Sequence, residues 1–251
     1  MLKRQLSAVL FGAILAVAMM AECEQVQAQQ VLRVGFQDAE PGLIRNSTNQ
    51  LGGRDIEIWN AITKDAGLGV TYVIMNNLAA LLPALDEGKM DVLSGVSRTP
   101  DTQSKYNLTA NLFMTAEALV VPKSDTRMYR GLDDIRGLNF ATLRNSTYAN
   151  YLKQVGIAGF KEFETTPAVL NAVSAGQASA AMFSGIIAGY LLKQGKFPDL
   201  QVAASYQPAL ARPIMAAFPK TATESFNKVN ASIQKLSADG TFRKILANYG
   251  Q

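Results

Sequence analysis

The sequence predicts an α/β protein made of two lobes, each a mixed sheet flanked by helices. After about residue 30, short apolar runs alternate with segments whose apolar residues recur at helical spacing, which is typical of α/β architecture. The segments 84–93 and 172–181 share one pattern, so the same design is expected in both halves of the chain. The length of 251 residues leaves room for two compact units of about 100 residues each.

The first part of the chain is predicted to be a signal peptide rather than part of this fold. Two basic residues precede an uncharged, mostly apolar stretch over 5–21, and a small-x-Ala pattern ends at Ala28. These are the parts of a secretory signal with its cleavage site. A spanning helix needs about 20 apolar residues, more than this stretch offers. A lipid anchor on Cys23 is not favoured, because Glu22 stands where a small residue is normal. We expect cleavage after Ala28 and a soluble protein in the periplasm.

The elements of the fold follow from apolar periodicity and from the residues that end each run. Runs rich in β-branched residues predict strands, and apolar residues at helical spacing that stop near a glycine predict helices. In the first half we expect strands at 31–36, 70–74, 90–93 and 116–121 and helices at 56–66 and 78–85. In the second half we expect strands at 138–143 and 179–183 and helices at 147–155, 167–175, 186–192, 226–236 and 241–249.

The internal match consists of a helix end, a glycine, two further residues, a short polar residue and an apolar strand. It occurs at Ala84–Leu93 and again at Ala172–Ala181, with Gly88 and Gly176 at the equivalent point. Glycine suits the residue that ends a helix because it adopts a left-handed conformation without steric cost. Such a match can arise by chance, but its place in two similar half-chains favours two related lobes.

Composition excludes several mechanisms and indicates no cofactor or metal. The chain has no histidine and one cysteine. It therefore has no Ser-His-Asp triad, no histidine zinc site and no cysteine-held iron–sulfur cluster. The net charge of +4 is small and the basic residues are scattered, which does not indicate nucleic-acid binding.

Five segments resemble a known family. The runs Leu32–Phe36 and Gly53–Trp59, the segment 82–100, the run Gly137–Thr147 and the ending Leu236–Tyr249 are similar in order and spacing to the extracellular solute-binding proteins of polar amino-acid ABC transporters. The likeness covers nearly all of the chain after the signal peptide. No single motif is specific, but together they resemble the bacterial extracellular solute-binding proteins of family 3. This resemblance implies the type II periplasmic-binding fold.

The resemblance implies a two-lobed clamp whose hinge strands let the lobes close on a ligand. The crossings are expected near Thr115–Leu119 and Ala211–Met215. The implied division is a signal peptide over 1–28, lobe one over 29–116, lobe two over 117–212 and a return to lobe one over 213–251.

The resemblance also places the ligand contacts, and two charged ones are replaced. Amino-acid binders of the family hold the α-carboxylate with an arginine, since a guanidinium matches a carboxylate well. That position corresponds to Thr102 here. They hold the α-ammonium with an aspartate, and that position corresponds to Ser184. If the alignment shifts by one residue, Arg98 is the alternative source of positive charge, although strand alternation would turn either Ser97 or Arg98 away from the cleft.

Other candidate ligand contacts agree with the family. Gly95 and Ser97 lie in the first-lobe ligand loop, where the family places a hydroxyl that bonds the ligand. Ser146 and Thr147 open a helix that is expected to face the cleft, where free N–H groups favour an anion or carbonyl; an ordinary N-cap explains them equally well. The candidates in the loop after the first strand are Asp38 and Glu40, for which a solvated carboxylate is the alternative.

These residues predict a solute-binding protein that captures a small polar ligand, amino-acid-like or an organic acid, and delivers it as a monomer to an inner-membrane ABC permease. It is expected not to be an enzyme, and the missing anchors argue against an ordinary α-amino acid. One alternative is an exported dehydratase on the same scaffold, with Glu40 as proton donor. The other is an accessory or sensor protein whose cleft has degenerated.

Overall fold

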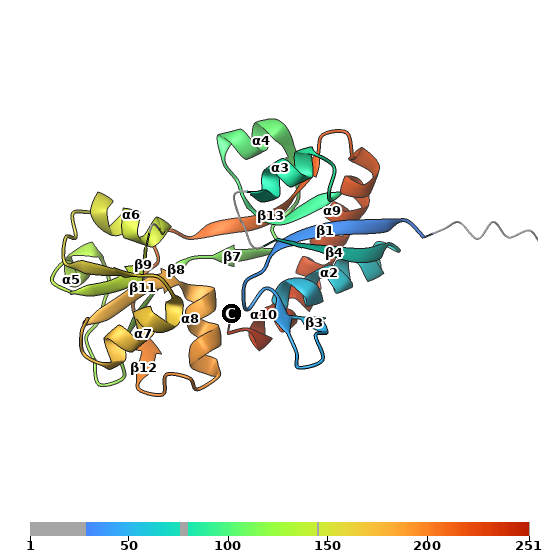
Figure 1. The fold of residues 1–251 in the computed structure, drawn as a ribbon. Coiled ribbons are helices and arrows are strands. Elements are labelled where there is room, and N and C mark those ends of the chain that lie inside the picture. The colour runs from blue at the N-terminus through green and yellow to red at the C-terminus, as the bar shows by residue number, and fades with distance from the viewer. Residues whose placement is uncertain (1–28, 76–79, 145, 251) are drawn as a thin grey trace, which may run out of the picture. The chain divides into compact units, whose positions relative to one another are not determined.

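The computed structural model describes residues 29–75, 80–144 and 146–250. The predicted signal peptide and Asn145 therefore lie outside the described residues. The described part is a mixed α/β structure with two large sheets flanked by helices (Figure 1), which confirms the predicted fold class. Within it, no helix is long and apolar enough to cross a membrane.

The first lobe is built on a six-stranded sheet. Its strands are β1 (Val31–Gln37), β4 (Gly69–Met75), β5 (Val92–Ser97), β6 (Tyr106–Leu108), β7 (Phe113–Thr115) and β13 (Arg212–Pro219). They lie in the order β4-β1-β5-β13-β6, with β7 also paired to β13. Strand β1 is parallel to β4 and β5, whereas β13 is antiparallel to β5, β6 and β7, so the sheet is mixed.

Two apolar clusters cover the faces of this sheet. Successive strand residues point to opposite faces, and on one face Leu32, Val34 and Phe36 of β1 pack with residues of three helices. On the other face, Leu93 of β5 packs with Leu85 in a separate cluster. The helices of the first face are α2 (Arg54–Asp65), α9 (Thr223–Ala238) and α10 (Thr241–Asn248), and the second face carries α3 (Leu81–Asp86), with α4 (Pro100–Lys105) before β6.

The second lobe is built on a five-stranded sheet in the order β10-β9-β11-β8-β12. Its strands are β8 (Glu117–Pro122), β9 (Phe140–Leu143), β10 (Phe160–Phe163), β11 (Ala180–Ser184) and β12 (Leu200–Val202). Strands β9, β10 and β11 are parallel, and β8 runs antiparallel to β11 and β12. A short hairpin, β2 (Ile44–Arg45) with β3 (Leu51–Gly52), stands apart from both sheets.

The two faces of this second sheet are covered by different helices. Along β11, Ala181 and Phe183 belong to one apolar cluster, and Ala180 and Met182 belong to the other. This is the alternation expected of a strand buried on both faces. The first cluster includes α7 (Thr166–Ser174) and α8 (Gly185–Lys193), and the second includes α5 (Leu132–Ile135) and α6 (Thr147–Gln154).

The predicted repeat is confirmed at the level of individual hydrogen bonds. Gly88 and Gly176 have left-handed φ angles of 71° and 70°. The residues after them donate backbone N–H groups to Ala84 and Ala172 at 2.9 and 2.8 Å. The two helix ends therefore form the same C-terminal cap before β5 and β11.

The chain passes between the sheets twice, as predicted. At Ala116 it leaves β7 of the first sheet for β8 of the second, and it returns from β12 into β13. The segments meet where Arg212 of β13 pairs with Thr115 of β7, and Figure 1 shows these strands side by side. The residue boundaries predicted for the lobes stay a prediction.

Strand β5 differs from its prediction, which placed it at 90–93. The Met90 side chain is buried beneath Gly35, and the Asp91 carboxylate accepts the backbone N–H of Arg33 at 2.8 Å. The Asp91 side chain thus takes the place of a backbone carbonyl as the acceptor for Arg33, and strand β5 begins only at Val92. It runs on to Ser97 because β13 pairs with it over that length. Strands β10 and β12 lie in segments for which we expected no element.

Candidate functional site

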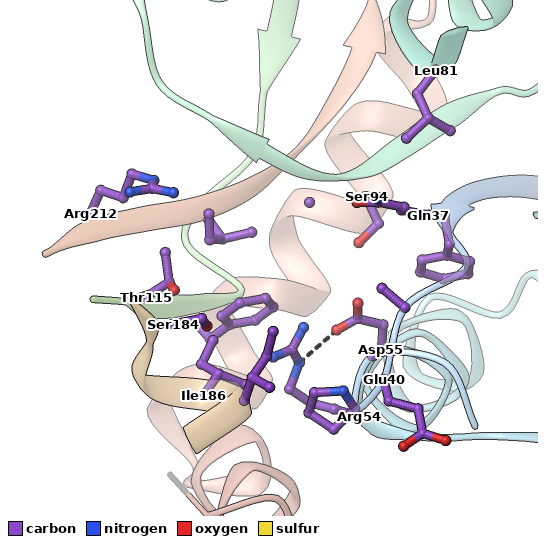
Figure 2. A pocket seen from close by; sticks show the side chains of 18 of the residues that line it. Gln37, Glu40, Arg54, Asp55, Leu81, Ser94, Thr115, Ser184, Ile186 and Arg212 are labelled. Carbon is purple, nitrogen blue, oxygen red and sulfur yellow. Dashed lines mark hydrogen bonds and ion pairs between the residues drawn. The ribbon is translucent and has the colours of Figure 1, made fainter. Parts of the chain in front are cut away.

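A pocket of about 250 Å³ lies where residues of both lobes meet. Figure 2 shows side chains of β1, α2, β5, β13 and the start of α8 converging on it. Its wall is part apolar and part polar, as in many small-molecule sites. The lining residues are Phe36, Gln37, Ala39, Glu40, Pro41, Gly42, Arg54, Asp55, Leu81, Ser94, Gly95, Phe113, Thr115, Tyr148, Ser184, Ile186, Ile187, Arg212 and Ile214.

The loop after β1 and the start of α2 form one continuous wall. The first N–H groups of a helix have no partner inside the helix. Here Arg54 and Asp55 donate theirs to the carbonyls of Pro41 and Gly42, both at 2.9 Å. Gly53 allows this close approach, because it has a φ of 107° and a Cβ there would lie 2.6 Å from the Gly42 oxygen. The loop is thus held on the helix, and Glu40 is carried to the pocket edge.

Arg54 is a buried cation whose charge the fold balances. Its Nε lies 2.7 Å from an Asp55 carboxylate oxygen, and the two side chains are 9% and 17% exposed. The guanidinium also lies over the ring of Phe113, 4.0 Å from its centroid. A guanidinium has five N–H donors. The hydrogen bond to Asp55 uses Nε, and the end of the side chain points into the cavity (Figure 2).

Strand β5 supplies a small, uncharged part of the wall. Ser94 is buried and accepts the Trp59 ring N–H at 2.9 Å. Gly95 follows with a φ of 90°, and a Cβ there would meet nothing within 4 Å. The wall therefore has open space beside Gly95, and the Ser94 hydroxyl is already engaged by the core of the first lobe.

Tyr148, Ser184 and Arg212 form the opposite wall. They come from α6, the end of β11 and the start of β13, and all three are half-buried. Burial raises the pKa of Tyr148, while its interactions with the Ser184 side chain and the Arg212 guanidinium oppose that rise. Three elements therefore bring a phenol, a hydroxyl and a cation together.

Arg212 differs from Arg54 because its charge has no adjacent acid. Among the described residues, no carboxylate oxygen lies within 4.0 Å of its guanidinium. The charges of Arg212 and Glu117 act in opposite directions on Tyr148: the guanidinium lowers the pKa of the phenol and the carboxylate raises it. Arg212 thus presents a cation to the pocket that no directly contacting acid neutralises.

Glu117 is a buried carboxylate that anchors the segment leading into β13. It is 2% exposed and accepts the Tyr206 hydroxyl at 2.9 Å. It also accepts the backbone N–H groups of Ala209 at 2.5 Å and Leu210 at 2.9 Å. A buried charge needs such partners. Because Arg212 follows two residues after Leu210, this carboxylate fixes the backbone that positions the cation.

Three of the predicted site residues line the pocket: Glu40, Gly95 and Ser184. Ser184 stands at its inner wall near Tyr148. Glu40 is exposed, and its carboxylate points away from the cavity (Figure 2). Their role in binding a ligand stays a prediction.

The other predicted residues lie outside this lining. Thr102 is buried in its own helix cap, where its hydroxyl bonds Thr99 and the Ser97 carbonyl. Arg98 donates to the Met215 sulfur at 3.3 Å. The Ser146 hydroxyl accepts the Ala149 N–H, as an ordinary N-cap does, and Thr147 is exposed beside it. Asp38 lies 3.7 Å from Arg45 at the surface.

Sequence reasoning missed both pocket arginines and Tyr148. One signal could have drawn attention to Arg54. It opens a helix, where the positive end of the helix dipole disfavours a cation, so its placement breaks a local rule. Tyr148 and Arg212 carry no such signal, because a tyrosine in a first turn and an arginine at a strand start are both ordinary.

The described residues do not bring three His, Cys, Asp or Glu side chains together in a way that could hold a metal ion. The pocket's polar groups are instead guanidinium, hydroxyl, amide and carboxylate groups. These groups can bind and orient a small polar molecule through hydrogen bonds and charge.

The fold and the pocket together define a class of protein. Two α/β lobes joined by two crossings, with a polar pocket where they meet, are the architecture of two-lobed ligand-binding proteins. Residues 32–251 match a family described as bacterial extracellular solute-binding proteins, family 3. The chain belongs to this family.

Relatives at lower similarity agree with the family. The chain is 26% identical over 230 residues to a probable amino-acid-binding protein, YxeM, of Bacillus subtilis, covering 87% of this chain and 83% of that protein. It is 26% identical over 233 residues to the glutamate-binding protein GluB of Corynebacterium efficiens, covering 87% and 78% of the two chains.

Solved structures support the fold. An ancestral cationic amino acid solute-binding protein, AncCDT-1, matches with a TM-score of 0.77 at 24% identity, covering 88% of this chain and 96% of that one. Another structure of that ancestral protein, described as a precursor of cyclohexadienyl dehydratase, matches with a TM-score of 0.67. The same fold thus occurs in a binding protein and in a precursor of an enzyme.

Proposed function

We propose that the protein is a periplasmic solute-binding protein that captures a small anionic solute between its lobes. The observation that carries this proposal is Arg212, a half-buried cation in a two-lobed pocket that no carboxylate of the described residues contacts. A cation in such a place is stabilised when a ligand brings the opposite charge, and a guanidinium binds a carboxylate through two parallel hydrogen bonds.

The remaining polar groups suit the same ligand. The Ser184 and Thr115 hydroxyls and the Tyr148 phenol lie in the wall that holds Arg212. Hydroxyl groups can donate to a carboxylate or accept from a hydroxyl. A small solute bound there would contact residues of both lobes, so binding would favour the state in which the lobes are closed.

Delivery to an ABC-type importer follows from family membership and from the predicted export signal. The family consists of extracellular solute-binding proteins. The basic start, the apolar stretch and the site after Ala28 support cleavage and export to the periplasm. In this proposal the partner is an inner-membrane permease and the protein acts as a monomer. N-terminal sequencing of the exported protein checks the cleavage site, and any start other than Gln29 contradicts it.

We propose binding without a chemical step. The acid considered from the sequence as a proton donor, Glu40, is exposed, and its carboxylate points away from the cavity. A proton donor must come within hydrogen-bond reach of the group it serves. Conversion of prephenate or arogenate by the wild-type protein, lost in Glu40→Gln, would contradict this part of the proposal.

Thermal-shift and calorimetric titration against a panel of small polar metabolites tests solute binding. Ile187 of α8 lines the pocket, so Ile187→Trp is expected to fill it and to abolish solute-induced stabilisation. Leu192 is a half-buried residue of the same helix that does not line the pocket, so Leu192→Trp is the matched control. If no solute stabilises the wild-type protein, the accessory or sensor alternative replaces this proposal.

A further inference from the structure

We infer that the solute is a carboxylate-bearing organic acid without an ammonium group, rather than a zwitterionic amino acid. This inference rests on the proposed function and names the ligand class of the same pocket. It follows from a comparison of the cations and anions that the two lobes bring to the cavity.

The cationic side is supplied by Arg54 and Arg212. Arg54 uses its Nε for Asp55, which leaves its terminal nitrogens at the cavity wall. Arg212 lines the cavity from β13, and Figure 2 shows its guanidinium group apart from that of Arg54. The lining therefore offers an acid two separate guanidinium groups.

The described residues of the lining offer no equivalent anionic partner for an ammonium group. The described acidic residues of the lining are Asp55 and Glu40. Asp55 is already paired with Arg54 at 2.7 Å, and Glu40 directs its carboxylate away from the cavity. Glu117, which lies behind the wall, is outside the lining, and three donors already occupy its carboxylate.

An amino acid would therefore bring a charge that the pocket does not pair. Moving an ammonium group out of water is costly unless a partner replaces its hydration. Here it would also approach Arg212 or Arg54, and like charges repel. An acid of the same length carries the carboxylate that the arginines attract and no ammonium group, so it should bind more tightly than its amino acid.

The rest of the wall suits a short hydrocarbon body. Phe36, Phe113, Ile186 and Ile214 supply apolar surface, and Ile187 adds to it from α8. A cavity of about 250 Å³ lies below the range of about 300–1,000 Å³ that drug-sized ligands occupy. The ligand is thus a small metabolite whose chain packs on these side chains and whose ends reach the guanidinium groups.

Matched ligand pairs that differ only in the ammonium group test this inference on the purified, exported wild-type protein. The pairs are propanoate with L-alanine, succinate with L-aspartate, and glutarate with L-glutamate, each titrated by calorimetry at neutral pH. In at least one pair the acid is expected to bind about tenfold or more tightly than its amino acid. Raising the salt concentration should weaken binding, because the attraction is between charges.

Variants then assign the selectivity to Arg212. Arg212→Gln is expected to weaken binding of the acid and to remove its advantage over the amino acid. Arg136 is a surface arginine of the second lobe that is paired with Asp133 and lies outside the lining. Arg136→Gln is therefore expected to keep the affinity for the acid and its advantage over the amino acid. Circular dichroism establishes that each variant is folded, and the wild-type comparison does not depend on either variant.

The possible results separate the ligand class from the proposed function. Binding of any amino acid as tightly as its matched acid overturns the organic-acid class and leaves solute binding intact. If neither the pairs nor a broad metabolite panel stabilises the protein, both the class and the proposed function are rejected. If Arg212→Gln keeps the acid preference, the assignment of that preference to Arg212 is overturned.

Discussion

The two ends of the pocket present the same side chain in different electrostatic states. At the end formed by α2, Arg54 is 9% exposed, paired with Asp55 and stacked on Phe113. At the end formed by β13, Arg212 is half-buried beside Tyr148 and Ser184, and no carboxylate in the described part of the chain contacts it. Both lie on rigid elements, so the difference comes from what the fold places next to each one.

This difference separates a structural charge from a charge kept for a ligand. A buried ion pair is largely satisfied within the protein, and removing one partner leaves the other desolvated. A cation without an acidic partner costs stability in the free protein and is compensated when an anion binds. We therefore expect stability to depend mainly on Arg54 and ligand affinity mainly on Arg212.

The largest expected effect is on stability at the paired end. Arg54→Met should lower the free energy of unfolding by about 3 kcal/mol, because it leaves the Asp55 carboxylate buried without its cation. Urea denaturation measures this. The double variant Arg54→Met/Asp55→Leu is the control, since replacing both partners by apolar groups should recover most of the loss. Equal destabilisation in the single and double variants would contradict the pairing argument.

The next effect is on binding at the unpaired end. Arg212→Gln should weaken ligand binding by about 2 kcal/mol, roughly thirtyfold, and change the free energy of unfolding by less than about 1 kcal/mol. Calorimetry and urea denaturation of the same preparation measure the two quantities. A variant that loses stability and keeps affinity would reverse the comparison between the arginines.

A smaller effect is expected from the anchor behind Arg212. Glu117→Gln keeps the shape of the side chain but turns an amide NH₂ toward donors that need an acceptor. It should cost about 1 kcal/mol of stability and weaken binding, because the segment that leads to Arg212 loosens. If Glu117 only stabilises the fold, the affinity of the folded variant will equal that of the wild type.

Alkaline pH should lower the stability of the protein through Tyr206, which contacts Glu117. Burial raises the pKa of Tyr206, and the Glu117 carboxylate raises it further by its charge and hydrogen bond. A raised pKa in the folded state means that stability is full below the ordinary tyrosine pKa of about 10 and is lost as pH rises above it. Unfolding measured across alkaline pH should show this loss, and Tyr206→Phe should reduce its slope. An unchanged slope in Tyr206→Phe would remove Tyr206 as its source.

Much of the fold was predictable because its signals are local. The apolar spacing of Ile56, Trp59 and Ile62 indicates α2, and the glycines at 88 and 176 mark two equal helix ends. Strands β10 and β12 were missed because they are short and lie at sheet edges, where fewer apolar residues are required. Strand β13 was expected only as a crossing, since its pairing with three strands is a long-range property.

The candidate site was less predictable. Gly95 lies within β5 and Ser184 ends β11, and both strands reach the pocket wall, which strand order can indicate. Thr102 carried a clear ligand expectation from resemblance, yet its hydroxyl caps its own helix. Local hydrogen bonding by a threonine competes with any more distant role, and spacing alone does not show which prevails.

The sequence by itself determined the class of fold, the order of most helices and strands, the repeated helix–glycine–strand turn and the family. These depend on periodicity and on glycine conformations, which act over a few residues. Only the tertiary structure decided which charges face the pocket and which are neutralised. Arg54 and Asp55 are adjacent in the chain, but Arg212, Tyr148 and Ser184 are far apart and meet through the pairing of strands and the packing of helices. Because electrostatic interactions depend on distance and burial, their balance is a property of the folded chain.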